Sequence, residues 1–351
     1  MARQSSFSVR RGSARAGAAL ALAVLIFSTL PASAVQSLFD SEEFFELTIR
    51  GPLNRLVRSA SAGTVVPGQM ELGDGTTIPI VFSKYGLSRL EECDLPLLKI
   101  EPDEMQARGT PFQGLRTVRL VTPCHHGSAW DRFILLEYLA YRSYAVIEEP
   151  ALRVRLVETH FLDSESAASE QTSLSFFVED IGAVAERYRM EWLDIESQPV
   201  DTLELSRLAR FALFQYMIGN TDWSAVEGPV GRRCCHNVAV LGSDADRFNT
   251  LLPFDFDHSG LVDAPYALPD ASLPIRSVTQ RTYRGFCASN EFLPAAITSF
   301  NERRSELERL FTNQGLPDPK VRKRALKYID SFYATINDPR KLERRIIDRC
   351  R

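Results

Sequence analysis

The sequence lacks an excess of basic residues, since 41 Lys and Arg stand against 45 Asp and Glu, a net charge of −4. Nucleic-acid binding needs a basic surface, so this composition argues against a nucleic-acid partner. After the first 34 residues no apolar run approaches the roughly 20 residues that cross a bilayer. Gly-x-Ser-x-Gly and His-Glu-x-x-His motifs are also missing, which removes two common kinds of hydrolase site.

The first 34 residues have the composition of a secretory signal peptide. Ala16–Leu30 is apolar, and Pro31–Ala34 offers small residues for cleavage after Ala34, with an uncleaved anchor as the alternative. Cleavage would leave 317 residues with a net charge of −8, because four of the basic residues are removed. We therefore expect export to the periplasm or the extracellular space, with no stable membrane span afterwards. The removed basic residues are Arg3, Arg10, Arg11 and Arg15.

All six cysteines follow the predicted cleavage site, and an even number in an exported chain favours disulfides. Cys93 and Cys124 flank two predicted neighbouring strands and form our first expected pair. Cys234 and Cys235 are adjacent, so we expect each to bond a distant partner such as Cys287.

Two structural metal sites are weaker alternatives. Cys124–His126 and Cys234–His236 group soft ligands, but zinc sites usually space their ligands by two to four residues. Asp255–Gly260 begins like a calcium loop, yet its twelfth position is Tyr266, where such a loop needs glutamate.

Periodicity divides the chain into a β-rich part and a helical part. Residues 35–69 are expected to hold a lead-in helix and a linker, residues 70–178 a β-rich region, and residues 179–351 a mostly helical region. The predicted strands are Thr76–Tyr85, Leu95–Ile100, Thr117–Thr122, Leu152–Phe161 and Leu174–Glu179. The predicted helices are Trp130–Ile147, Ile181–Arg189, Thr202–Ile218, Glu291–Thr312, Pro319–Ala334 and Arg340–Asp348.

Residues 216–260 contain an ordered series of oxygen-bearing side chains. Asp222 follows an apolar helix in a Gly-Asn-Thr-Asp turn, Asn237 opens a strand, and Asp255 and Asp257 close another. Phosphoryl transfer needs a carboxylate to orient the attacking hydroxyl, and an amide oxygen and a further carboxylate to hold Mg²⁺. An ordinary turn or capping role is the competing interpretation of each residue.

On these motifs, residues 205–262 resemble the divergent protein-kinase-like families of the spore-coat protein H and HipA types, especially secreted bacterial members. The resemblance implies an α+β, two-lobed protein-kinase-like fold with a β-rich N-lobe and a mostly helical C-lobe. It also implies transfer of phosphate from ATP, with Mg²⁺ or Mn²⁺, to a protein or small-molecule hydroxyl acceptor. Asp222 would be the catalytic aspartate, and Asn237 and Asp255 would bind metal, with Asp257 as the close rival of Asp255.

The same resemblance calls for a cation over the phosphates and a carboxylate on the following helix. Glu137 is the expected carboxylate, and Arg119 or Lys99 the expected cation, although the family pattern prefers lysine at the position of Arg119. The sequence has no glycine-rich nucleotide loop, since 71–76 holds only two glycines.

Two other functions stay open. The chain could be a non-catalytic, pseudokinase-like module for binding or assembly in the envelope, which the scarcity of nucleotide outside the membrane favours. It could also be a disulfide-bonded structural protein whose acidic motifs are solvated turns.

Overall fold

The computed structural model describes residues 36–59, 63–86, 89, 93–166, 170–243, 247–313 and 318–351. The predicted signal peptide and its cleavage site lie outside these residues. No helix within the described ranges has the length and apolar character needed to cross a membrane.

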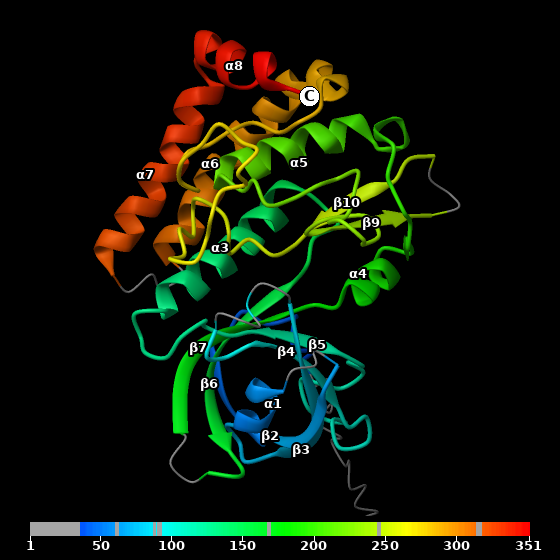
Figure 1. The fold of residues 1–351 in the computed structure, drawn as a ribbon, viewed down its shortest axis with the longest axis vertical. Coiled ribbons are helices and arrows are strands. Elements are labelled where there is room, and N and C mark those ends of the chain that lie inside the picture. The colour runs from blue at the N-terminus through cyan, green and yellow to red at the C-terminus, as the bar shows by residue number, and fades with distance from the viewer. Residues whose placement is uncertain are drawn as a thin grey trace, which may run out of the picture. The chain divides into compact units, whose positions relative to one another are not determined.

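Seven strands close into a barrel in the order β1-β2-β3-β4-β5-β7-β6 (Figure 1). All neighbours pair antiparallel except β1 and β6, which are parallel. Alternate residues face the interior, as Ile78, Ile80 and Phe82 do on one strand. The strands are β1 (Phe45–Gly51), β2 (Val65–Leu72), β3 (Thr77–Tyr85), β4 (Leu97–Pro102), β5 (Val118–Val121), β6 (Val154–Asp163) and β7 (Glu170–Val178).

The predicted two-lobed protein-kinase-like fold is wrong, because the strands form a closed, mixed barrel next to a helical region. Residues 35–69, expected to be a helix and linker, contain β1, the short helix α1 (Leu53–Arg58) and the start of β2. β1 pairs with both β2 and β6 and so joins the two edges of the sheet. The five strands predicted from alternation correspond to β3–β7 and would alone leave β3 and β6 as open edges.

Gly68 follows Pro67 within β2 and allows close packing in the barrel interior. A Cβ at Gly68 would lie 2.5 Å from the Phe82 ring and 2.6 Å from the Arg50 carbonyl oxygen. Phe82 is almost fully buried in the barrel core. Close packing against Phe82 and the Arg50 carbonyl oxygen therefore requires a glycine at this position of β2.

We expect Gly68→Ala to lower the free energy of unfolding by about 2 kcal/mol, because overpacking a close core displaces its neighbours. Gly73→Ala is the matched control: a Cβ there would meet only the Glu46 carbonyl oxygen, at 3.8 Å. Its effect should stay within about 0.5 kcal/mol. Urea unfolding followed by circular dichroism measures both, and equal effects would contradict the packing argument.

The helical region matches the predicted helices closely. A three-stranded sheet of order β10-β9-β8 packs with it. The helices are α3 (Asp131–Ile147), α4 (Ile181–Arg187), α5 (Leu205–Ile218), α6 (Leu293–Asn313), α7 (Pro319–Ile336) and α8 (Pro339–Arg345). The strands are β8 (Glu191–Trp192), β9 (Val238–Gly242) and β10 (Thr250–Pro253), and 3₁₀ turns cover Val200–Thr202, Cys287–Phe292 and Ile347–Arg349.

An aromatic cluster between α3 and α5 fixes the chain beyond β10. The Phe256 ring is fully buried, 4.6 Å from the ring centroid of Tyr141 on α3 and 5.5 Å from that of Phe214 on α5. Edge-to-face contacts of this kind favour one ring orientation. Phe256 therefore anchors the segment that also carries its two neighbours in the sequence, Asp255 and Asp257.

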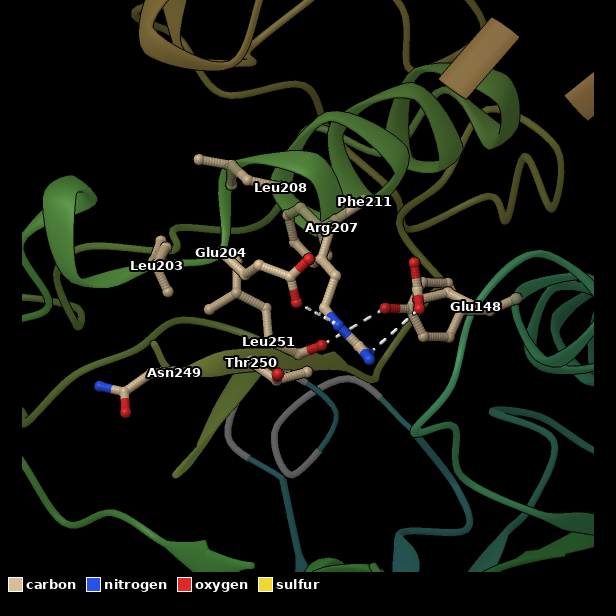
Figure 2. Close-up of a pocket in the computed structure, with 10 residues that line it drawn as sticks. Glu148, Leu203, Glu204, Arg207, Leu208, Phe211, Asn249, Thr250 and Leu251 are labelled. Carbon is tan, nitrogen blue, oxygen red and sulfur yellow. Dashed lines mark hydrogen bonds and ion pairs between the residues drawn. The ribbon is translucent and has the colours of Figure 1, made fainter. Parts of the chain in front are cut away.

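Partly buried ion pairs hold α5 to the end of α3. Figure 2 shows Arg207 reaching Glu148, whose carboxylate lies 3.1 Å from the Arg207 guanidinium and also pairs with Arg210. The small cavity there has a volume of about 10 Å³, room for about one water molecule. The cavity is therefore too small for a ligand larger than water.

All six cysteines form disulfides, which is compatible with an exported protein. The predicted Cys93–Cys124 bond is confirmed. The prediction for Cys234 and Cys235 is wrong, because they bond to each other, and Cys287 bonds to Cys350. Cysteines in disulfides are not metal ligands, so the zinc alternative loses its thiolates.

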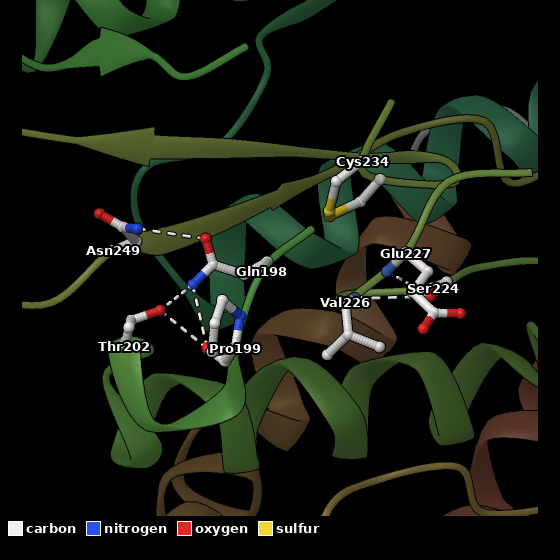
Figure 3. The surroundings of a disulfide bond; sticks show 9 residues. Gln198, Pro199, Thr202, Ser224, Val226, Glu227, Cys234 and Asn249 are labelled. Atoms are coloured by element: carbon white, nitrogen blue, oxygen red, sulfur yellow. Dashed lines mark hydrogen bonds between the residues drawn. A yellow bond between two sulfur atoms is a disulfide. The ribbon is translucent and has the colours of Figure 1, made fainter. Parts of the chain in front are cut away.

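Figure 3 shows the surroundings of the Cys234–Cys235 disulfide, which directly precedes His236 and Asn237. On the β10 side, the Asn249 amide donates to Gln198 Oε1 (3.1 Å). Ser224 and His236 exchange two backbone hydrogen bonds of 3.0 and 3.2 Å. The disulfide therefore lies in a connected loop region beside the candidate site.

Candidate functional site

A cavity of about 1100 Å³ is lined by barrel strands, helix α3 and the segments around β9 and β10. These elements belong to one compact unit, residues 35–351. The lining includes every site residue predicted from the sequence, so residues far apart along the chain meet here. They are Lys99, Arg119, Glu137, Asp222, Asn237, Asp255 and Asp257. Their chemical roles stay predictions.

Asp222 follows helix α5 in a turn that depends on Gly219. Gly219 has a left-handed backbone (φ 66°), and a Cβ there would lie 2.1 Å from the Tyr328 hydroxyl oxygen. Asn220 Oδ1 then accepts a hydrogen bond from the Asp222 amide (2.9 Å). Glycine adopts this conformation without steric cost. The Gly-Asn-Thr-Asp sequence thus turns the chain so that Asp222 lines the cavity.

Both carboxylate oxygens of Asp222 are hydrogen-bonded. His236 Nε2 lies 2.8 Å from Oδ1, and Asn237 Nδ2 donates to Oδ2 (3.0 Å) and to the Asp222 backbone oxygen (2.9 Å). Burial raises the pKa of Asp222, but the hydrogen bond from His236, the His236 and His258 charges and the Asn237 amide outweigh it. The pKa is therefore lowered, and the carboxylate is ionised near neutral pH.

The pairing of β9 with β10 brings Asn237 and Asp255 to one place. Asn237 immediately precedes β9, and its carbonyl oxygen accepts a hydrogen bond from the Phe254 amide (3.0 Å). In an antiparallel pair, the start of one strand lies beside the end of the other. Asp255, two residues past β10, therefore lies at the strand end where Asn237 begins.

Asp255 and Asp257 lie beyond the strand that the sequence analysis extended through them. β10 ends at Pro253, and Asp255 has a positive φ of 62°. Its amide donates to the Tyr141 hydroxyl (2.8 Å). Both aspartates line the cavity, so the expected grouping arises from a turn and not from strand alternation.

Glu137 adds a third carboxyl group to this end of the cavity. Its side chain is 3% exposed in the middle of α3, and Asp257 is 4% exposed. Arg89 Nε lies 3.6 Å from Asp257 Oδ2. Three buried or half-buried carboxyl groups therefore face the charge of one guanidinium, which leaves an excess of acidic groups.

This excess is visible in the pKa values. Burial, reinforced by the charge of Asp257, raises the pKa of Glu137 to about 8, although Arg89 and the Phe256 amide oppose the shift. Burial, with the charges of Asp257 and Glu137, raises the pKa of Asp255 well above its usual value. Crowded carboxyl groups of this kind take up either protons or a cation.

The two predicted phosphate-binding cations are neighbours. Lys99 on β4 and Arg119 on β5 are register partners, so their side chains share one face of the barrel wall. Lys99 Nζ lies 2.7 Å from Glu101, and the Arg119 guanidinium lies 5.7 Å from the Tyr85 ring centroid. Glu137 interacts electrostatically with Arg89, and its expected partnership with Lys99 or Arg119 stays a prediction.

Sequence reasoning missed Arg89 and the contact of His236 with Asp222. Arg89 belongs to no motif, and its partners Asp257 and Tyr266 are remote in the chain; the Arg89–Tyr266 hydrogen bond is 2.8 Å. The sequence signal that could have indicated His236 is its position directly before Asn237 in the motif.

A separate group of metal-type ligands lies on the barrel. Glu46, Glu158 and His160 have ligand atoms within 4.8 Å of one another, and in the described part of the chain the cavity carboxylates do not gather so tightly. Glu46 and Glu158 are register partners on β1 and β6, and the His160 ring contacts Thr172.

No protein-family model matches this chain, and no curated protein does. The resemblance described for residues 205–262 therefore rests on their motifs alone.

Proposed function

We propose that this protein is an exported phosphotransferase that uses ATP and Mg²⁺ or Mn²⁺ to phosphorylate a hydroxyl group on a protein or a small molecule. The observation that carries the proposal is the meeting, around one cavity, of an ionised aspartate, an acidic cluster and two cations. These are the three kinds of group that phosphoryl transfer uses.

The donor set suits a hard divalent cation. Asp255, Asp257 and the Asn237 amide oxygen are the oxygen ligands that Mg²⁺ and Mn²⁺ favour. The raised pKa values of Glu137 and Asp255 indicate that these carboxyl groups are short of positive charge. A bound cation would supply that charge and neutralise the phosphates.

Asp222 would orient the acceptor hydroxyl group. His236 and Asn237 fix its carboxylate from two sides, so little freedom is lost when a hydroxyl group arrives. Its lowered pKa makes it a weak base, which suffices because the phosphoryl-transfer transition state is loose and needs little proton removal. Lys99 and Arg119 would contact the phosphates from the barrel side.

Cation binding gives the first test. We expect Mn²⁺ with ATP to raise the Tm of the mature protein by a few degrees, as about 100-fold saturation stabilises by about 2.7 kcal/mol. Asp255→Asn should abolish this rise. The same substitution should raise the Tm without the cation, because asparagine needs neither a proton nor a cation to be neutral beside Asp257 and Glu137. Differential scanning fluorimetry measures both effects.

Asp201→Asn is the matched control, since Asp201 is exposed and is not among the residues that line the cavity. It should leave both Tm values unchanged. A wild-type protein that gains no stability from any combination of ATP with Mg²⁺ or Mn²⁺ would contradict the proposal.

Two observations favour the non-catalytic alternative. Both carboxylate oxygens of Asp222 already have hydrogen-bond partners, and arginine replaces the lysine that the motif prefers. Such a binding module would gain stability from ATP and cation without transferring phosphate. Transfer of labelled phosphate to an acceptor, or hydrolysis of ATP, separates the two functions.

A further inference from the structure

A second cavity, of about 550 Å³, lies on the helical region between the segment 274–282 and helices α7 and α8. Among the described residues that line it, four are arginines and none is acidic, although acidic residues outnumber basic ones in the whole chain. We call it the arginine cavity. Its arginines are Arg281, Arg344, Arg345 and Arg349.

Arg281 is fixed in position by neutral groups. Its guanidinium donates to the backbone oxygens of Met217 (2.9 Å) and Tyr328 (2.7 Å) and to Ser331 Oγ (2.6 Å). It also lies 3.6 Å from the centroid of the Tyr328 ring. These contacts orient the half-buried guanidinium, and none of its partners in the described part of the chain is a carboxylate. Buried charges normally have a counter-charge.

The other arginines increase this positive charge. Burial lowers the pKa of Arg281, and the positive charge of Arg345 lowers it further. Arg344, Arg345 and Arg349 are exposed at the rim, and hydroxyl groups such as those of Thr282 and Thr335 complete the lining. Like charges repel one another here, and an anion with several oxygens would remove that repulsion.

The cavity walls are joined covalently. The Cys287–Cys350 disulfide, with a Cα–Cα distance of 4.9 Å, connects the chain after Arg281 to the chain after Arg349. Arg351 and Gly285 add a backbone hydrogen bond of 3.0 Å. The cavity is therefore held in shape before any ligand arrives, which reduces the entropy lost on binding.

We propose that the arginine cavity binds a small soluble molecule that carries two or more phosphate or sulfate groups. Guanidinium groups pair with such oxyanions through two hydrogen bonds at once. Four of them exceed the need of a single inorganic phosphate, and the volume is typical of small-molecule sites. The arginine cavity shares no lining residue with the candidate site, so this inference does not depend on the proposed function.

Arginines in the last turn of a helix also interact favourably with its dipole, which would explain Arg344 and Arg345 alone. That effect requires no binding partner. It does not account for Arg281 and Arg349, which reach the same cavity from other segments.

Isothermal titration calorimetry of the mature protein with pyrophosphate and inositol hexakisphosphate tests the proposal. The buffer should contain about 0.15 M salt and no divalent cation, so that long-range attraction is screened. We expect one equivalent of at least one probe to bind. The Arg344→Ala/Arg345→Ala variant should lose about 100-fold in affinity, since hydrogen bonds to charged groups are strong.

Two control variants separate binding in the arginine cavity from general attraction of anions to the protein. Lys323→Ala/Lys327→Ala removes the same charge from exposed α7 positions outside the lining, and Arg119→Ala removes a cation from the candidate site. Both should stay within about 3-fold of wild type. The proposal is overturned if neither probe binds, if either control loses as much affinity as the double variant, or if only vesicles of anionic lipid bind.

Discussion

Replacing Asp222 by asparagine is expected to reduce phosphoryl transfer about 10³-fold while ATP still binds. The substitution keeps the size of the side chain but removes the negative charge that orients the acceptor hydroxyl. His236 and the Asn237 amide contact the carboxylate now, and rotation of the new amide can restore part of these hydrogen bonds. We therefore expect a stability loss of only about 1 kcal/mol.

Steady-state kinetics separate this effect from a structural one. A group that acts in the transition state lowers kcat and kcat/KM equally, and the KM for ATP should stay unchanged. If kcat is retained in Asp222→Asn, the role assigned to Asp222 is wrong. If the wild-type protein binds ATP but transfers no phosphate, the non-catalytic alternative holds.

Asp180→Asn provides a matched control within the same cavity. Asp180 lines the cavity, and its side chain caps α4 by accepting a hydrogen bond from the Gly182 amide (2.8 Å). Asparagine caps a helix as well as aspartate does, so stability should not change. Equal losses in the two variants would indicate that any nearby negative charge, and not Asp222 in particular, supports the activity.

Local periodicity predicted most elements but could not predict the closed barrel. In the predicted strands after residue 76, apolar and polar residues alternate clearly, and the long helices have apolar faces. In β1 the buried Leu47 and Ile49 alternate, as strand residues do. Phe39 and Phe44 precede β1, and together with Leu47 they give the spacing of apolar residues that is typical of a helix. The parallel pairing of β1 with β6 joins residues more than 100 positions apart, and no local pattern specifies it.

The candidate site was predictable where one motif held several groups. Asp222, Asn237 and Asp255 occur within 34 consecutive residues, and strand pairing brings them to one cavity. Arg89 could not be found in this way, because its partner Asp257 is fixed by tertiary packing. The Cys234–Cys235 bond was missed for a different reason: adjacent cysteines were expected to reach distant partners.

Replacing Glu179 by glutamine is expected to lower the free energy of unfolding by about 3 kcal/mol. The Glu179 side chain is 2% exposed and accepts hydrogen bonds from the guanidinium groups of Arg153 (2.9 Å) and Arg187 (2.8 Å). Removing one partner from a buried ionic cluster costs about 3 to 5 kcal/mol. We expect a loss at the lower end of this range, because both arginines are partly exposed and can turn towards water.

The position of Glu179 makes this cluster important for the whole described unit. β7 ends at Val178 and α4 begins at Ile181, so Glu179 lies where the chain passes from the barrel to the helical region. Its amide donates to the Arg153 carbonyl oxygen (2.9 Å), and the Arg153 amide donates to its carboxylate (3.1 Å). The loss should therefore appear as a lower urea midpoint for the cooperative transition, with Glu186→Gln, an exposed α4 position, as the control.

A double-mutant cycle with Arg187→Gln distinguishes the ionic cluster from a general effect of lost burial. If Glu179 acts through its charge, Arg187→Gln should cost much less once Glu179 is already glutamine, because the guanidinium then has no carboxylate to neutralise. We expect a coupling free energy of about 1 to 2 kcal/mol, reduced by the remaining pair of Arg153 with Asp40. Additive losses would mean that the two side chains stabilise the junction independently, and the role assigned to the Glu179 charge would be wrong.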